Sequence, residues 1–106
     1  MYNVHMKQLQ FVWDENKNRR NRAKHGISFE TAAQAFDDPF AITLRDRIVE
    51  DEERWRTLGS VANCIILLVV HLYRDDQDEE CIRIISARKA TPTERNAYEK
   101  NVKENT

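Results

Sequence analysis

The stretch CIILLVVHLY, residues 64–73, decides the fold of this 106-residue chain. An almost wholly apolar run of this length is typical of a central strand whose two faces are both covered. A second strand-like stretch, CIRIISA at residues 81–87, follows an acidic segment at residues 75–80. We expect these to be neighbouring long strands, with the acidic segment as the solvated tip of a hairpin.

Alternating apolar and polar residues predict further strands on the N-terminal side of this pair. Residues 40–44 and 54–58 both alternate, and an acidic loop at residues 50–53 separates them. We expect a turn at residues 59–63. A short first strand is predicted at residues 9–13, and residues 1–7 are expected to be loosely held.

Three helices are predicted from their capping signals. Asp14 is a suitable N-cap for a helix through Lys24, which Gly26 would end in the left-handed conformation. Ser28 is suited to cap a second helix, amphipathic and stopped before Pro39. A last helix is predicted over residues 92–101, because Thr91, Pro92 and Glu94 form a capping-box pattern.

The predicted order is therefore β-α-α-β-β-β-β-α, in one domain over residues 1–106. Strands that follow one another closely favour an antiparallel sheet, so the expected class is α+β, with two N-terminal helices and one C-terminal helix. We expect the helices to cover one face of the sheet. The other face is expected to stay partly open and to be available for binding.

Composition excludes several classes of protein. With 41% hydrophobic and 33% charged residues, the chain is too apolar to be disordered. The longest apolar run, residues 64–70, is too short for a bilayer, and no signal-peptide pattern opens the sequence, so we expect a cytoplasmic protein without membrane contact. Cys64 and Cys81 are expected to be reduced core thiols. No metal-ligand spacing or glycine-rich phosphate loop occurs in the sequence, and we expect neither a metal nor a cofactor.

Charge is distributed unevenly although the formal net charge is only −1. Acidic residues gather at residues 50–53 and 75–80. Basic residues form two groups, namely Lys17, Arg19, Arg20, Arg22, Lys24 and His25, and then Arg83, Arg88 and Lys89. The two groups either merge in the fold into one patch that attracts an acidic partner, or remain two separate solvated faces.

Several ordered motifs resemble those of the BrnT family of toxins. They are Trp13-Asp14 with Lys17, the run Lys24-His25-Gly26-Ile27-Ser28-Phe29-Glu30, Arg54 with Gly59, and Arg83 through Thr91 with Glu94 and Tyr98. The resemblance covers about nine tenths of the chain. It implies a RelE-like fold, metal-independent RNA cleavage, and a small DNA-binding antitoxin of the BrnA kind that occludes the toxin.

Metal-free RNA cleavage requires charge stabilisation on the phosphoryl oxygens, and arginine is suited to this task. Its planar group stays charged and donates two hydrogen bonds to one phosphate, so Arg54, Arg83 and Arg88 are the candidates. Strand alternation predicts that Arg83 lies on the same face as Ala87, and that Arg88, at the strand end, turns toward either face. The alternative for Arg83 and Arg88 is a structural salt bridge.

Cleavage also requires a proton acceptor at the 2′-OH and a proton donor at the leaving 5′-oxygen. His71 is a candidate for either role, although a single histidine in a strand is also compatible with a structural role. His25 and Lys24 are further candidates, with the alternative that both interact with the C-terminal end of their helix.

Four more residues are candidates for RNA binding: Trp13, Lys17, Arg22 and Lys89. Trp13 is suited to stack on an unpaired base, or else to anchor the core. Glu94 and Tyr98 are interpreted as a capping glutamate and a packing tyrosine.

Two hypotheses follow. The first is an endoribonuclease toxin that acts on single-stranded RNA, is neutralised by its antitoxin, and meets DNA only through that antitoxin. The second is a noncatalytic module whose basic surface docks an acidic or amphipathic segment of a partner protein.

Overall fold

The computed structural model describes residues 9–75 and 78–106. The elements in chain order are β1 (Gln10–Val12), α1 (Glu15–His25), α2 (Phe29–Ala33), the 3-10 helix η1 (Gln34–Asp37), β2 (Ile42–Val49), β3 (Glu52–Val61), the 3-10 helix η2 (Ala62–Cys64), β4 (Ile65–Asp75), β5 (Asp78–Lys89) and α3 (Pro92–Glu104). The predicted α+β class is confirmed.

The five strands form one sheet in the order β1-β5-β4-β3-β2. Each hairpin-linked pair is antiparallel, as expected, but β1 runs parallel to β5. The prediction of a wholly antiparallel sheet is therefore wrong, and the sheet is mixed. The physical reason is that only strands joined by short hairpins must run antiparallel, whereas β1 reaches β5 through the whole intervening chain.

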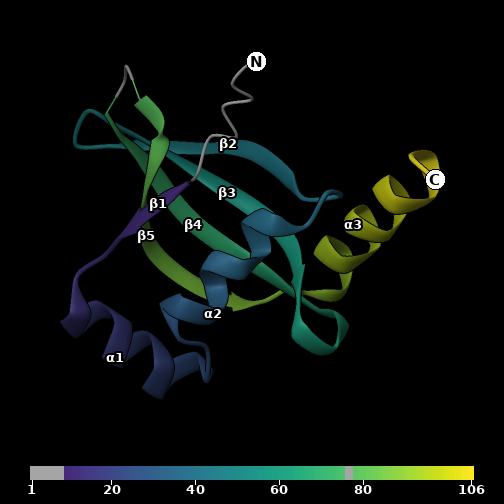
Figure 1. The fold of residues 1–106 in the computed structure, drawn as a ribbon, viewed down its shortest axis with the longest axis horizontal. Coiled ribbons are helices and arrows are strands. Elements are labelled where there is room, and N and C mark those ends of the chain that lie inside the picture. Colours follow the sequence, from purple (N-terminus) through teal and green to yellow (C-terminus); the bar gives the residue numbers. More distant parts are fainter. Residues whose placement is uncertain (1–8, 76–77) are drawn as a thin grey trace, which may run out of the picture.

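Helices pack on both faces of the sheet. Figure 1 shows α2 in front of the strands and α3 beside them. The larger core cluster, built around Phe29, Leu67 and Ile84, joins one face of the sheet to α2, η1 and the approach to α2. A smaller cluster of Leu58, Leu68 and Tyr98 lies between the other face and α3. We call the first face the helix-covered face.

The capping signals define the helices as predicted. Asp14 accepts hydrogen bonds from two backbone N–H groups at the start of α1, and Gly26 ends that helix with a φ of 73°. The Ser28 side chain caps α2, and both bonds of the capping box are present at Thr91 and Glu94. The predicted second helix is split, because α2 continues as the tighter η1 before Pro39.

Two local predictions are wrong. Gly59 lies within β3, not in a turn, and an added Cβ would come within 2.5 Å of the Ala35 carbonyl oxygen, so glycine permits η1 to approach the strand. Cys64 is exposed and has a φ of 60°, because η2 ends there and β4 begins one residue later. It is therefore not a core thiol.

In the described residues no helix is long and apolar enough to span a membrane.

Candidate RNA-binding face

A β-bulge at Ile85 decides which face of the sheet the β5 arginines occupy. Val70 pairs with Ser86, but its neighbour His71 pairs with Ile84, so Ile85 is the extra residue. The bulge returns Ala87 to the helix-covered face with Ile84, and both are buried there. The predicted placement of Arg83 on the face of Ala87 is therefore wrong, because alternation breaks at Ile85.

The same bulge places Arg83 and Arg88 on one face although they are five residues apart. Their cross-strand partners are Leu72 and Leu68, two positions of β4 with the same parity. Leu72 follows His71, whose side chain lies on the helix-covered face and contacts Phe36 of η1. Arg83 and Arg88 therefore belong to the opposite face of the sheet.

Strand β3 adds arginines to that opposite face. Trp55 pairs with His71, so Arg54 and Arg56 on either side of Trp55 point away from the helix-covered face. Arg47 of the edge strand β2 pairs with Arg54 across a second bulge. We call this surface the arginine face, and its members are Arg47, Arg54, Arg56, Arg83 and Arg88.

Charge on the arginine face is only partly neutralised. Arg88 makes a two-pronged ion pair with Glu94 of α3, at 2.8 and 3.0 Å. Hydrogen bonding to Arg88 lowers the pKa of Glu94 to about 2, so the pair stays ionised. In the described part of the chain, Arg54 and Arg83 have no ion-pair partner, and the buried Nε of Arg54 has no hydrogen-bond partner.

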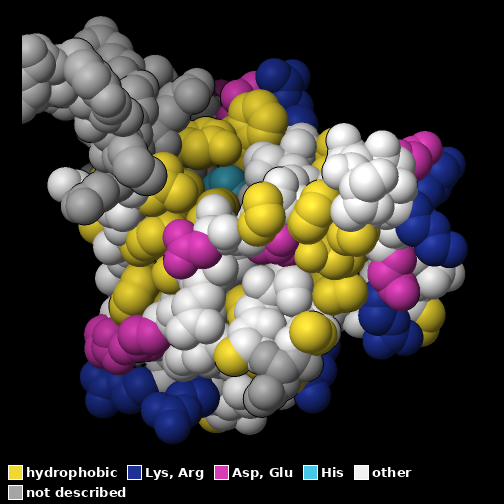
Figure 2. Space-filling model, turned by 45° about the vertical axis from the view of Figure 1, so that its right-hand side comes forward, with side chains coloured by type: hydrophobic (Ala, Val, Ile, Leu, Met, Phe, Trp, Pro, Cys, Tyr) yellow, Lys and Arg dark blue, Asp and Glu magenta, His cyan; other side chains and the backbone are white. Residues whose placement is uncertain are grey.

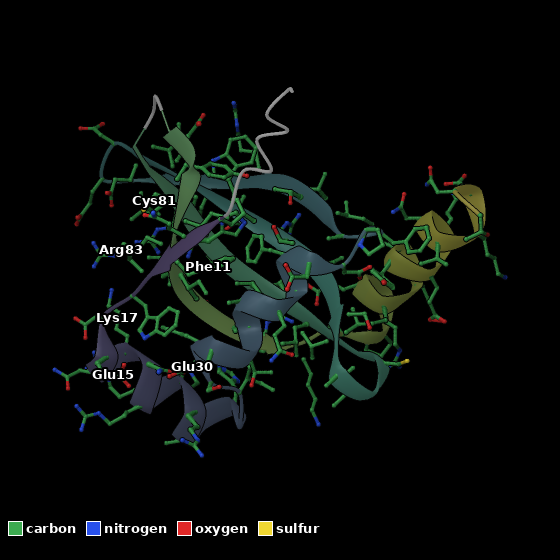
Figure 3. The ribbon with its side chains drawn as sticks, in the orientation of Figure 1. Phe11, Glu15, Lys17, Glu30, Cys81 and Arg83 are labelled. Carbon is green, nitrogen blue, oxygen red and sulfur yellow. The ribbon has the colours of Figure 1, made fainter. Side chains whose placement is uncertain are left out.

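The opposite side of the molecule differs in character. Figure 2 looks obliquely onto the helix side, and there hydrophobic and acidic side chains occupy the middle while Lys and Arg lie at the rim. In Figure 3, Arg83 of β5 and Lys17 of α1 lie on the same side of the view, at the margin of the sheet. The arginine face thus differs from the middle of the helix side, because its strands carry arginines without an ion-pair partner among the described residues.

The structure separates His71 from these arginines. His71 has 0% exposed surface and lies on the helix-covered face, where Nε2 is 2.8 Å from the Thr57 hydroxyl. The ring contacts Phe36 and Tyr73 edge-on. Burial lowers its pKa to about 4, so the ring is neutral at physiological pH.

The predicted basic residues of α1 lie at its two ends. Lys17 is half-buried in the first turn, whereas Arg22, Lys24 and His25 belong to the last turn, where cations interact favourably with the helix dipole. Helix α1 packs against β5, the strand of Arg83 and Arg88. Lys89 ends β5 and is exposed.

Trp13 is held in place by contacts on the helix-covered side. Its ring packs edge-on against Phe29, and its Nε1 donates to a carboxylate oxygen of Glu15 at 3.1 Å. These contacts favour the core-anchor alternative over base stacking.

Sequence reasoning missed two buried asparagines of α1, Asn18 and Asn21. The Asn21 side chain donates to the backbone oxygen of Ala87 and accepts from its N–H. It thereby satisfies backbone groups of β5 beyond the end of its pairing with β1. Asn18 accepts from the backbone N–H of Phe29 and donates to Glu30. Their three-residue spacing in a helix without an apolar stripe was the available signal.

Sequence reasoning also missed Asp38, which connects α3 to the sheet. The carboxylate accepts from the Tyr98 hydroxyl and from the backbone N–H groups of Phe40 and Ser60. Burial raises the pKa of Asp38, but these hydrogen bonds outweigh it and the net shift is downward. Burial and Asp38 together raise the pKa of Tyr98 to about 12, so Tyr98 is a packing residue that stays protonated.

No group of three or more His, Cys, Asp or Glu side chains lies close enough to hold a metal ion among residues 9–75 and 78–106. What the face offers chemically is fixed positive charge from planar guanidinium groups. Such groups are suited to bind phosphate or carboxylate.

A small mixed sheet with helices on both faces, and with arginines on one of them, places the chain in the class of compact α+β proteins. Within that class, the fold is similar to the crystal structure of the Brucella abortus ribonuclease toxin BrnT, with a TM-score of 0.56, 24% sequence identity, and coverage of 79% of this chain and 99% of that one. The comparison with curated proteins gave no match.

The family described as ribonuclease toxin, BrnT, of type II toxin–antitoxin system matches residues 13–94. The chain belongs to this family. The resemblance seen in the sequence motifs is thereby confirmed.

Proposed function

We propose that this chain is an endoribonuclease that cleaves single-stranded RNA without a metal ion. The ribose 2′-oxygen attacks the adjacent phosphorus, the bond to the 5′-oxygen breaks, and the products carry a 2′,3′-cyclic phosphate, which water opens to a 3′-phosphate, and a 5′-hydroxyl. One proton leaves the 2′-OH and one is delivered to the leaving 5′-oxygen. The match to a family of ribonuclease toxins supports this reaction class.

The observation that carries the proposal is the pair of unneutralised arginines, Arg54 and Arg83. They lie on strands separated only by β4, and so their backbones are about 10 Å apart across the sheet. Two flexible guanidinium groups at this separation reach one phosphate from both sides and stabilise the charge that grows on it in the transition state. Arg88 lies on the same face, but its ion pair with Glu94 offsets its charge and fixes its guanidinium group.

Proton transfer is assigned to Lys24 or His25. Both reach solvent at least in part, and their helix packs on the strand that carries Arg83. His71 is not assigned this role, because it has no exposed surface. Lys17, Arg22 and Lys89 would attract the flanking phosphates of the RNA, a contribution that salt weakens.

The partner proposed for this toxin is an antitoxin of the BrnA kind, which would carry DNA binding for the complex, and the compartment proposed is the cytoplasm. The membership in a toxin–antitoxin family supports an antitoxin. We propose that acidic or apolar segments of the antitoxin cover Arg83 and its neighbours, so that antitoxin and RNA exclude each other. Simultaneous binding of both in a competition assay would contradict this arrangement.

The test is RNA cleavage by purified protein in excess EDTA, comparing wild type with Arg83→Ala and Arg83→Lys. We expect cleavage to persist in EDTA, Arg83→Ala to lose about 10²–10³-fold in rate, and Arg83→Lys to recover only part of it, since lysine keeps the charge without the planar fork. Circular dichroism checks that both variants are folded.

Binding without cleavage by the wild-type protein, at the same affinity for RNA and for an acidic peptide, would instead favour the noncatalytic binding module. Loss of cleavage in EDTA that magnesium restores would contradict the metal-independent reaction.

A further inference from the structure

A cleft opens between α3 and strands β2 and β3 on the arginine face. Its volume is about 360 Å³, which lies within the range of small-ligand sites. The lining residues are Leu44, Arg56, Leu58, Leu68, Thr91, Thr93, Glu94 and Ala97. The cleft adjoins the arginine face, and Arg56 belongs to both.

The cleft is apolar inside and charged at its margin. Leu58 and Leu68 are buried beneath α3, whereas Leu44 is 51% exposed, so apolar surface of the cleft meets solvent. Arg56 pairs with Val70 and is exposed. The other charged group, Glu94, is held by Arg88.

We propose that this cleft binds the base of the nucleotide next to the cleaved phosphate, and that it is the specificity-determining site of the enzyme. The inference rests on the proposed ribonuclease function. Nothing in the cleavage chemistry itself requires the cleft, because the arginines proposed to hold the phosphate, Arg54, Arg83 and Arg88, do not line it.

The chemistry of a nucleotide matches the cleft part by part. A base is planar, with two apolar faces, and is suited to lie between leucine side chains and the plane of a guanidinium group such as Arg56. Its phosphate carries negative charge, which would neutralise the adjacent arginines. This complementarity favours a nucleotide over a purely apolar occupant, which would leave the charged margin unpaired.

Glu94 gives the cleft a chemical preference. Its Oε1 accepts from both Arg88 and the Thr91 backbone, whereas the bond from Arg88 is the sole hydrogen bond to Oε2 in the described residues. A carboxylate oxygen has room for two donors, so Oε2 retains one acceptor position. Because the pKa of Glu94 is low, this oxygen accepts and does not donate. An exocyclic amino group satisfies it, and the carbonyl oxygen of uracil does not.

The first experiment tests a cleft-filling variant and a control variant with oligonucleotides that have or lack the base. Ala97→Leu narrows the cleft with a good helix former. Asn96→Leu, one residue earlier at an exposed position that does not line the cleft, is the matched control. The readout is the affinity for a 2′-deoxy-substituted, noncleavable oligonucleotide, with and without its base at the tested position.

We expect removal of the base to weaken binding to wild type and to Asn96→Leu by about tenfold. Ala97→Leu should bind the intact oligonucleotide about tenfold more weakly than wild type and should show little further loss with the abasic one. Equal losses from base removal in all three proteins would overturn the proposal. Undetectable binding of any RNA by wild type would instead contradict the proposed function, so the two failures are distinguishable.

The second experiment compares cytosine with pyrimidin-2-one at the same position, because this analogue lacks only the exocyclic amino group that Glu94 would accept from. We expect several-fold tighter binding of cytosine by wild type, and a smaller preference in Ala97→Leu. Equal affinity for the two bases in wild type would contradict the role of Glu94.

Discussion

The two faces of the sheet solve the problem of polar side chains in different ways. On the helix-covered face, His71 and Thr57 are buried, and a chain of hydrogen bonds runs from Thr43 through Thr57 to His71. On the arginine face, Arg54 and Arg83 carry full charges without an ion-pair partner in the described residues.

This difference supports the proposal that the arginine face binds RNA, whereas the helix-covered face stabilises the fold. A buried polar group is stable when it is hydrogen-bonded and, if charged, paired. His71 is neutral and its Nε2 is hydrogen-bonded to Thr57, whereas its buried Nδ1 has no hydrogen-bond partner in the described residues. A cluster of like charges is unfavourable for folding, and a bound anion would relieve the repulsion. His71, a candidate for proton transfer from the sequence, therefore lies on the helix-covered face.

The largest effect that tests this difference between the faces is expected from Arg54→Ala. Removal of a charge partner of the transition state should lower the rate of RNA cleavage about 10²–10³-fold. The matched control is Arg45→Ala, which removes an arginine that already pairs with Glu53 and lies over Trp55 on the other face. Single-turnover cleavage rates of folded proteins provide the measurement, and equal losses in both variants would show that the faces do not differ in function.

The sequence predicted the elements well because their signals are local. Asp14, Ser28 and Thr91 each cap a helix, as their spacing from the following residues predicted. The direction of β1 was not predictable in the same way, since its partner is far away in the sequence and alternation carries no information on strand direction.

The sequence singled out candidate arginines, but it could not predict how they are arranged. Arginine chemistry singled out Arg54, Arg83 and Arg88, and the register places all three on one face. Their convergence depends on the bulge at Ile85, which no residue of β5 signals, because bulges without glycine follow from the pairing of two strands. Arg47 and Arg56 were missed for the same reason.

The second prediction sharpens the comparison through pH. The folded-state pKa of His71, about 4, lies below the ordinary value of 6.5. The folded protein therefore resists protonation while the unfolded chain accepts it, and stability is fully present above pH 6.5 and falls as pH drops toward 4. The loss by pH 4 should reach about 3 kcal/mol.

Urea denaturation across this pH range provides the measurement. His71→Gln should be less stable at pH 7 but should show a flatter dependence between pH 6.5 and 4, and His25→Gln, at a half-exposed position of α1, should keep the wild-type slope. A wild-type slope in His71→Gln would assign the pH dependence to other groups.

The smallest effect is expected at Thr91, where α3 begins over the arginine face. The Thr91 hydroxyl accepts from the Glu94 backbone N–H at 3.2 Å, and the Glu94 carboxylate accepts from the Thr91 backbone N–H at 2.8 Å. Thr91→Ala removes the first bond and should destabilise the protein by about 1 kcal/mol, whereas Thr91→Ser keeps an oxygen there and should retain most of the stability.

Urea denaturation gives the size of this loss, and amide hydrogen exchange gives its location. Faster exchange confined to the first turn of α3, with the strands unchanged, would show that α3 covers the arginine face without supporting the helix-covered core. Faster exchange in β4 and β5 as well would contradict that independence, because it would mean that both faces of the sheet depend on the start of α3.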